Sequence, residues 1–101
     1  MAIAWIYILC CADGSYYTGH TTHLERRLAE HQAGEGSDWT KSRLPVELVF
    51  AQEMPDESQA LIVEQQIKGW SRAKKGALIA EQWNLLRYLS KKPSFRAKSP
   101  P

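Results

Sequence analysis

Two tyrosines, an arginine, a histidine and a glutamate are the residues of this chain that could together cleave a phosphodiester. Tyr7 and Tyr17 lie in short aromatic stretches on either side of a polar turn, and Arg27 and His31 follow one helical turn apart. A phenol, a permanently charged guanidinium and an imidazole can move protons and neutralise phosphate oxygens. Further on, Glu64 interrupts the apolar face of a second helical segment. Core packing requires neither Arg27 nor His31, so these five residues form a candidate catalytic site.

Each of these residues also has a structural interpretation. Either tyrosine alone could be a core or sheet aromatic, and Arg27 could pair with Glu30 on a helix surface. His31 could be a helix C-terminal residue stabilised by the macrodipole. Glu64 is harder to dismiss, because a carboxylate among apolar neighbours normally needs a partner or a metal. Lys68, four residues later, could supply that partner as an ordinary salt bridge.

The strands that must position the tyrosines are predicted from composition. Residues 5–11 and 16–19 are rich in aromatic and β-branched side chains and are joined through Asp13-Gly14, which favours an antiparallel hairpin. Residues 46–50 predict a third strand, either in the middle or at the edge of the same sheet. A small antiparallel sheet is therefore expected.

A helix that carries Arg27 and His31 is predicted directly after the hairpin. Thr22-His23-Leu24-Glu25 has the pattern of a capping box, with Thr22 at the N-cap, and predicts a helix to about Ala33. Gly34 and Gly36 are expected to end it, and residues 34–45 to form a polar loop.

Further helices are predicted in the second half of the chain. Asp56 is expected to cap the helix that carries Glu64, and Gly69 to end it. Ser71 is expected to cap another helix to about Ala80, which continues or restarts through residues 83–89. The elements together predict an α+β fold, a small three-stranded antiparallel sheet flanked by helices.

Size and composition predict one globular domain. The chain has 101 residues, of which 44% are hydrophobic and 24% are charged. No window approaches the ~20 apolar residues of a membrane span, and no secretory leader is expected. Cys10 and Cys11 are adjacent in a predicted strand and should point to opposite faces, so they do not indicate a disulfide framework. A reduced, cytoplasmic compartment is the default expectation.

The net charge of +2 conceals an asymmetry between the two parts of the chain. Residues 1–86 carry more acidic than basic side chains, whereas residues 87–101 carry five basic residues and no acid. We therefore predict a domain over residues 1–89 and a basic, flexible tail over residues 90–101. The tail could attract phosphates or be a generic soluble terminus. The acidic balance of the domain argues against coating of DNA without regard to sequence.

Two short motifs resemble those that name the GIY-YIG nuclease superfamily, and within it the small single-domain bacterial proteins of the YhbQ type. Trp5-Ile6-Tyr7 keeps the Ile-Tyr part of the first motif, with Trp in place of Gly. Tyr17-Thr18-Gly19 has Thr where the second motif has Ile. The resemblance covers about residues 5–80 and implies a three-stranded antiparallel sheet flanked by helices.

Two helical segments extend the resemblance. Residues 24–31 are similar to the family's helix with a catalytic arginine, which falls at Arg27, and residues 57–68 are similar to its metal-site helix, with the metal ligand at Glu64. The resemblance implies a one-metal endonuclease that uses Mg²⁺ or Mn²⁺ to hydrolyse DNA, and branched, flapped or damaged DNA is the expected substrate. The implied catalytic set is Tyr7, Tyr17, Arg27, His31 and Glu64. We expect these five side chains to converge on one concave surface open to solvent.

Other polar residues receive weaker assignments. His20 follows the second motif, where some family members carry a lysine, and could assist proton transfer or be an ordinary loop histidine. Asn84, the only asparagine, is expected to be a surface helix residue. If basic side chains flank the cleft, they should hold the DNA backbone; the candidates are Lys41, Arg43, Lys68, Arg72, Lys74 and Lys75.

Two classes of function remain open from the sequence. The first is the metal-dependent endonuclease, favoured because all five expected polar residues are present. The second is a nucleic-acid-binding module of the same fold that has lost catalysis or depends on a protein partner. A purely structural domain would leave Arg27, His31 and Glu64 unexplained.

Overall fold

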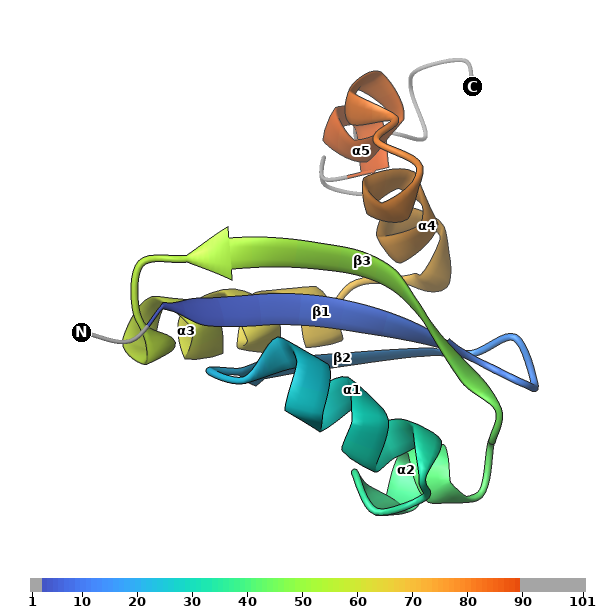
Figure 1. Ribbon diagram of the computed structural model, residues 1–101. Coiled ribbons are helices and arrows are strands. Elements are labelled where there is room, and N and C mark those ends of the chain that lie inside the picture. The colour runs from blue at the N-terminus through green and yellow to red at the C-terminus, as the bar shows by residue number, and fades with distance from the viewer. Residues whose placement is uncertain (1–2, 90–101) are drawn as a thin grey trace. The chain divides into compact units, whose positions relative to one another are not determined.

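The computed structural model describes residues 3–89, so the predicted basic tail lies outside the described residues. Residues up to Gly69 form one compact unit, and those from Trp70 form a second. Figure 1 shows the elements in chain order: β1 (Ala4–Cys11), β2 (Tyr16–Thr21), α1 (Leu24–Gln32), α2 (Asp38–Lys41), β3 (Val46–Met54), α3 (Glu57–Lys68), α4 (Arg72–Ile79) and α5 (Trp83–Leu89).

The predicted α+β fold is confirmed by a three-stranded antiparallel sheet in the order β2-β1-β3. In the β1–β2 pairing, Tyr7 lies opposite Gly19, Leu9 opposite Tyr17, and Ile6 opposite His20. The third strand lies at an edge of the sheet and is longer than residues 46–50. A register shift in its pairing with β1 falls between Ile8 and Leu9.

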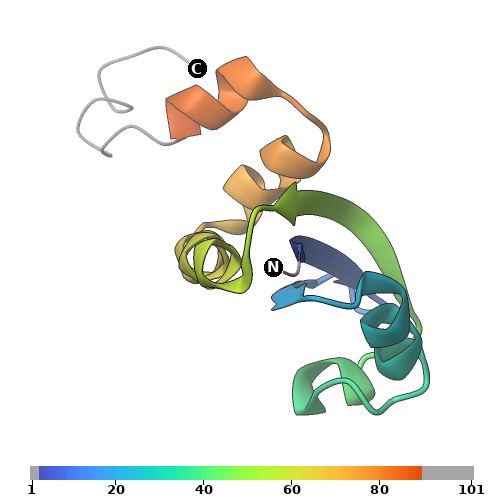
Figure 2. The ribbon, with the colours of Figure 1, turned by 60° about the vertical axis from the view of Figure 1, so that its left-hand side comes forward.

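The alternation of side chains along β1 and β2 divides the site residues between two faces. Tyr7 and Leu9 pack with Leu24 and Leu28 of α1 in one apolar cluster, which also contacts Tyr17. The intervening residues of β1, together with Thr18 and His20 of β2, lie on the other face. Figure 2 shows α1 and α3 on opposite sides of the sheet. We call these sides the α1 face and the α3 face.

The start of α1 differs from the predicted capping box. His23, not Thr22, is the N-cap residue, and no side chain caps the helix. Thr21 Oγ1 accepts the His23 backbone N–H at 3.0 Å, while Thr22 Oγ1 and His23 Nδ1 lie 2.9 Å apart. The threonine hydroxyls are thus occupied at the strand end before the helix begins. Gly34 follows the helix with φ +81°, a backbone conformation that favours glycine.

The segment predicted as a loop over residues 34–45 contains the short helix α2. Ser37 caps it by accepting the Thr40 N–H on its hydroxyl at 3.2 Å. The two later N-caps are as predicted: Asp56 accepts the Gln59 N–H at 2.8 Å, and Ser71 accepts the Lys74 N–H at 3.2 Å. Gly69 is the C-cap residue of α3, and α5 restarts after a break.

Two further expectations concern the state of the cysteines and the presence of a membrane-spanning helix. Cys10 and Cys11 are both free thiols, the first half-buried and the second buried, as alternation along a strand predicts. Among residues 3–89, no helix has the length and apolar character needed to cross a membrane.

Candidate active site

Three rings from two strands and one helix gather on the α1 face. Tyr7 Oη lies 2.8 Å from His31 Nε2, and the two rings meet edge to face with centroids 5.7 Å apart. The Tyr17 ring lies 6.5 Å from Tyr7 and 5.2 Å from His31. Tyr7 is 2% exposed and His31 0%, whereas Tyr17 is half-buried. Tyr17 is therefore the phenol that a substrate can reach directly.

Arg27 adds a fixed positive charge beside these rings. Its guanidinium donates to Glu30 Oε1 at 3.1 Å and to the Gly36 carbonyl at 2.6 Å. The side chain is 32% exposed, so an anion from solvent can approach it. Because a planar guanidinium can also fork onto two phosphate oxygens, Arg27 suits the binding of a phosphodiester.

Two glycines make room for the buried rings. A Cβ on Gly19 would lie 2.5 Å from Tyr7 Oη, and one on Gly36 would lie 2.2 Å from His31 Nδ1. Both rings thus pack directly against backbone. Gly36 was expected only to end the helix that carries Arg27, and neither its contact with His31 nor its bond to Arg27 has a signal in a single sequence.

Burial keeps Tyr7 and His31 uncharged at neutral pH. Desolvation raises the pKa of Tyr7 to about 12, although the hydrogen bond from Arg27 opposes this rise. Desolvation, followed by the nearby Arg27 charge, lowers the pKa of His31 to about 4. The pair is therefore a phenol and a neutral imidazole, which interact through hydrogen bonds and not through charge.

Glu64 lies in a different environment on the α3 face. It is 5% exposed, and its carboxylate accepts from Lys68 Nζ at 2.8 Å and from His20 Nδ1. The other ring nitrogen of His20 lies 3.8 Å from Glu57 Oε2. Burial alone would raise the pKa of Glu64, but the bonds and charges of Lys68 and His20 outweigh it and lower the pKa. Glu64 is thus an ionised, paired carboxylate at neutral pH, and His20 has a defined structural contact.

Three of the five candidate residues, Tyr7, His31 and Glu64, are buried. Tyr7, Tyr17, Arg27 and His31 are together on the α1 face, and only Tyr17 and Arg27 are partly exposed. Glu64 lies across the sheet, yet its charge contributes to the raised pKa of Tyr7. The two environments meet at edge strand β2, where Gly19 has no side chain and the Tyr7 hydroxyl lies over its backbone.

The donor set suits a divalent metal held by one protein ligand. Among residues 3–89 there is no group of three His, Cys, Asp or Glu side chains that could enclose an ion. A single ionised carboxylate is a ligand that Mg²⁺ and Mn²⁺ accept, because these ions keep several waters or substrate oxygens. A carboxylate has about four lone-pair sites, so Glu64 retains acceptor capacity beside Lys68 and His20.

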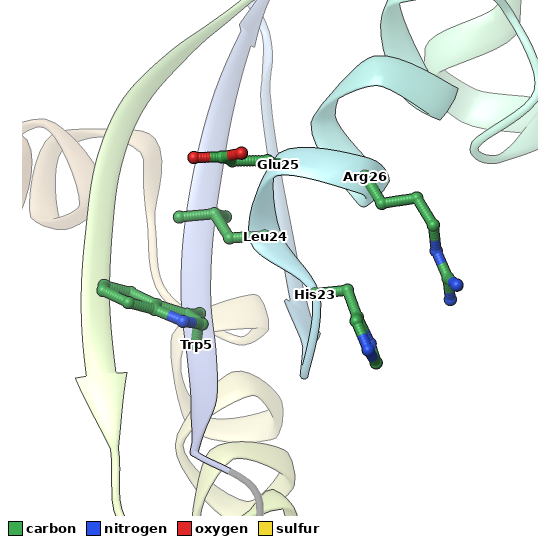
Figure 3. A pocket seen from close by; sticks show the side chains of 5 residues that line it. All are labelled: Trp5, His23, Leu24, Glu25 and Arg26. Carbon is green, nitrogen blue, oxygen red and sulfur yellow. The ribbon is translucent and has the colours of Figure 1, made fainter.

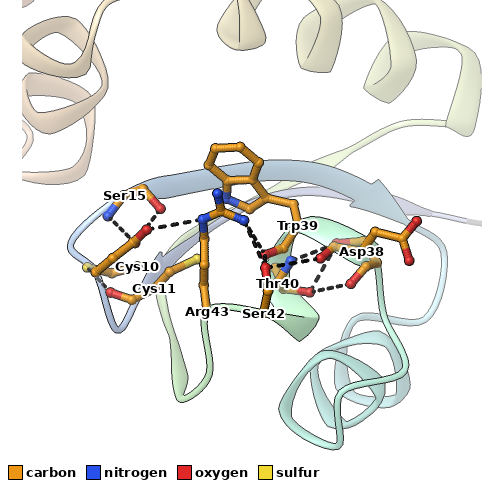
Figure 4. A network of polar contacts seen from close by, with 10 residues as sticks. Cys10, Cys11, Ser15, Asp38, Trp39, Thr40, Ser42 and Arg43 are labelled. Atoms are coloured by element: carbon orange, nitrogen blue, oxygen red, sulfur yellow. Dashed lines mark hydrogen bonds and ion pairs between the residues drawn. The ribbon is translucent and has the colours of Figure 1, made fainter.

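Arg43, predicted to bind DNA, is engaged within the protein (Figure 4). Its Nε donates to Asp13 Oδ2 at 3.1 Å, and its Nη1 donates to the Trp39 carbonyl at 3.0 Å. The guanidinium carbon lies 3.5 Å from the centroid of the Trp39 ring. Arg43 therefore braces the β1–β2 turn against the α2 segment.

The remaining predicted DNA-binding residues occupy three separate places. Lys41 is exposed beside a cavity of about 480 Å³ that Gly36 also lines. Lys68 is paired with Glu64, as above. Arg72, Lys74 and Lys75 belong to α4 in the second unit, where Lys74 Nζ lies 4.2 Å from the Trp70 ring centroid. Asn84 accepts a bond from Arg87 on exposed α5, as expected of a surface helix residue.

A second cavity lies at the N-terminal end of α1 (Figure 3). Its volume is about 550 Å³, and its lining includes the indole of Trp5 and the side chain of Leu24. Trp5 is two residues before Tyr7 on β1 and shares the α1 face with it. An indole beside the candidate site can stack with a nucleobase.

Comparisons with known proteins identify the family of this chain. Residues 3–77, most of the chain, match the family described as GIY-YIG catalytic domain. The chain belongs to the GIY-YIG family. The matched range contains all five candidate residues and ends within α4. As a GIY-YIG domain, the chain is placed among nucleases, and an endonuclease activity is supported in general terms.

Relatives of this GIY-YIG domain include UPF0213 proteins. One from Natronomonas pharaonis is 50% identical over 78 residues, which cover 77% of this chain and 92% of the relative. One from Streptococcus pneumoniae is 42% identical over 87 residues, covering 84% and 88%. The solution structure of UPF0213 protein BH0048 from Bacillus halodurans is 35% identical, with a TM-score of 0.53, and covers 89% of this chain and 99% of that one. The solution structure of EF2693 from E. faecalis is 32% identical, with a TM-score of 0.54, and covers 91% and 93%.

Proposed function

We propose that this chain is a divalent-metal-dependent endonuclease that hydrolyses DNA phosphodiester bonds. The observation that carries the proposal is the hydrogen-bonded pair of Tyr7 and His31, which lies near the Arg27 guanidinium and the half-buried phenol of Tyr17 in a GIY-YIG domain. This set combines a fixed cation with two phenols and a neutral imidazole, which are groups that phosphodiester cleavage requires.

The chain's own residues have distinct tasks in this proposal. Arg27 binds two phosphate oxygens with the exposed part of its guanidinium, while its bonds to Gly36 and Glu30 fix its orientation. Tyr17 contacts the substrate, because it is the more exposed of the two phenols. Tyr7, protonated and buried, aligns Arg27 and His31. Tyr17, the half-buried phenol, is the proposed acceptor of the proton of the attacking water.

Glu64 is the proposed ligand of one Mg²⁺ or Mn²⁺ ion. The support is its ionised state and the position of its helix against β2, the strand that carries Tyr17 and Gly19. A bound divalent ion would supply positive charge that stabilises the phosphate and the leaving oxygen. His20 and Lys68 hold the carboxylate in place and keep it ionised.

We further propose that the substrates are branched or damaged DNA, in repair or recombination within the cytoplasm. The acidic balance of residues 1–86 supports recognition of a local DNA structure over uniform coating of a duplex. The two free cysteines support a reducing compartment.

A cleavage assay on single-stranded, duplex, flapped and branched DNA, with and without Mg²⁺ or Mn²⁺, tests the function. We expect cleavage that requires the metal and is faster on a branched or flapped substrate than on plain duplex. Binding without cleavage on every substrate and metal would instead support the non-catalytic or partner-dependent module. Cleavage that persists in a chelator would contradict the metal assignment.

A further inference from the structure

Thr40 is a buried polar residue that the proposed mechanism has not used. It is 0% exposed, and its Oγ1 lies 2.8 Å from His31 Nδ1, the ring nitrogen opposite the one that meets Tyr7. The same oxygen lies 3.0 Å from Ser37 Oγ and donates to the Ser37 carbonyl at 3.4 Å. Thr40 thus connects the Tyr7–His31 pair to the first turn of α2.

The two ends of this hydrogen-bond chain fix its direction. The Ser37 carbonyl can only accept, and it accepts from Thr40 Oγ1, while the Arg27 guanidinium, whose charge acts on the Tyr7 phenol, can only donate. Between these ends the proton of Tyr7 goes to His31 Nε2, and the proton on Nδ1 goes to Thr40. Each donor is then matched with one acceptor, and the bonds reinforce one another.

The reverse direction leaves a buried proton without an acceptor among residues 3–89. If Thr40 donated to Nδ1, His31 would carry its proton on Nε2, and Tyr7 Oη would accept from His31. The phenol proton would then need another partner, although Tyr7 is 2% exposed and lies against Gly19. An unmatched buried hydroxyl is disfavoured, because it has lost its hydrogen bonds to water without replacement.

We propose that Thr40 is a positioning residue that holds His31 in the tautomer protonated on Nδ1, so that the Tyr7 hydroxyl points toward His31 and its oxygen lone pairs face Arg27. This proposal rests on the proposed function for its catalytic consequence, but the tautomer itself does not depend on activity. Gly36 contributes by allowing the imidazole to pack against backbone, where only the hydroxyl of Thr40 meets Nδ1.

The test compares three variants by long-range ¹H–¹⁵N correlation spectra of the histidine ring nitrogens at neutral pH. T40V keeps the volume and removes the hydroxyl, while T40S keeps a hydroxyl. T18V is a matched control, because Thr18 is also a buried threonine (2% exposed) but its hydroxyl has no hydrogen-bond partner in the structure. We expect the Nδ1–H pattern for His31 in the wild type, T40S and T18V, and its loss in T40V.

Cleavage kinetics supply the second readout. We expect T40V to lower kcat about 10-fold with little change in KM, and T40S to restore most of the loss, because a misdirected Tyr7 affects the chemical step more than binding. A wild-type His31 protonated on Nε2 would overturn the proposal, as would a T40V protein with the wild-type spectrum and rate. Absence of cleavage in the wild type would refute the proposed function alone, since the spectra still decide the role of Thr40.

Discussion

Buried polar side chains are stabilised differently on the two faces of the sheet. On the α1 face, Tyr7 and His31 are uncharged and are matched donor to acceptor. On the α3 face, Glu64 keeps its charge because Lys68 and His20 both bind it. An unpaired charge in the same position would be strongly disfavoured. The α1 face therefore holds an uncharged hydrogen-bonded pair beside the cation of Arg27, whereas the α3 face holds an ionised carboxylate.

Gly19 lies where the α1 face and the α3 face meet, at the edge of the sheet. It lies on edge strand β2 opposite Tyr7, and neighbouring residues of the same strand face α3. Since no side chain separates the Tyr7 hydroxyl from the Gly19 backbone, the phenol is close enough to the edge for the charge of Glu64 to affect its pKa. A substrate bound at this edge would experience both environments.

The largest effect is expected from removing the charge of the α3 face. E64Q keeps the volume of the side chain but loses the negative charge that would hold a divalent ion. We expect cleavage to fall by at least about 100-fold, given the scale of transition-state charge stabilisation, while DNA affinity changes little because Arg27 is intact. Thermal melts with and without Mn²⁺ provide the check: a metal-induced rise in Tm should appear in the wild type and disappear in E64Q.

A matched control and the pH dependence distinguish a metal-binding role of Glu64 from its salt bridge with Lys68. E57Q removes a more exposed carboxylate near the same histidine and should leave cleavage and the Mn²⁺ response unchanged. Because folding lowers the pKa of Glu64, its ionised form adds stability above the ordinary pKa of 4.5, and this contribution is lost as the pH falls through the folded value. The Tm difference between wild type and E64Q should therefore narrow in acid. Identical metal responses of the two proteins would contradict a metal site at Glu64.

The next largest effect is expected on the α1 face, at Arg27. R27A should lower cleavage about 100-fold and also weaken DNA binding, whereas E64Q should affect cleavage alone. R27K should recover part of the binding but little of the rate, because an ammonium cannot reproduce the planar contacts with Gly36, Glu30 and Tyr7. Single-turnover rates and equilibrium binding measured on the same DNA distinguish the two losses. Equal losses of DNA affinity in R27A and E64Q would contradict the proposal that Arg27 binds the phosphate and Glu64 affects cleavage alone.

A smaller effect, on stability, is expected at the edge between the faces. G19A would place a methyl group 2.5 Å from Tyr7 Oη, and the buried ring would have to move. We expect a loss of about 1–3 kcal/mol in the free energy of unfolding. G76A is the matched control: its Cβ meets nothing within 4 Å, and the helical position should gain up to about 1 kcal/mol. Urea unfolding measures both, and a neutral G19A would show that Tyr7 does not need the bare backbone.

The sequence predicted the elements of this fold well because their signals are local. Alternating β-branched and aromatic residues indicated the strands, and Asp56 and Ser71 cap their helices as expected. The capping box failed because Thr21 and Thr22 bond locally around His23 before the helix begins. The short helix α2 was missed because a four-residue element has too few positions to show a period.

The candidate site was predicted in its residue types but not in its arrangement. Glu64 belongs to α3 and the arginine and histidine to α1, and these helices cover opposite faces of the sheet, which follows only when the pairing register and the face covered by each helix are known. On α3, Leu61 and Ile62 are exposed while Glu64 is buried, so hydrophobicity alone does not identify the inner face. The contacts of Gly36 and Thr40 with His31 come from a loop that returns to α1, and they have no local signature.

The smallest expected effect concerns the face along which DNA lies. Lys41 is exposed beside a cavity that Gly36 lines, whereas the ammonium of Lys68 is already matched with Glu64 at 2.8 Å. A cation that neutralises a phosphate releases counterions, so its removal should lower the slope of log affinity against log salt by about one unit. We therefore expect K41A to lower this slope by about one and K68A to lower it by less, with sequence preference unchanged in both. Titrations of one branched DNA at several salt concentrations make the measurement. A larger change of slope in K68A than in K41A would contradict this expectation and would place the DNA backbone on the α3 face.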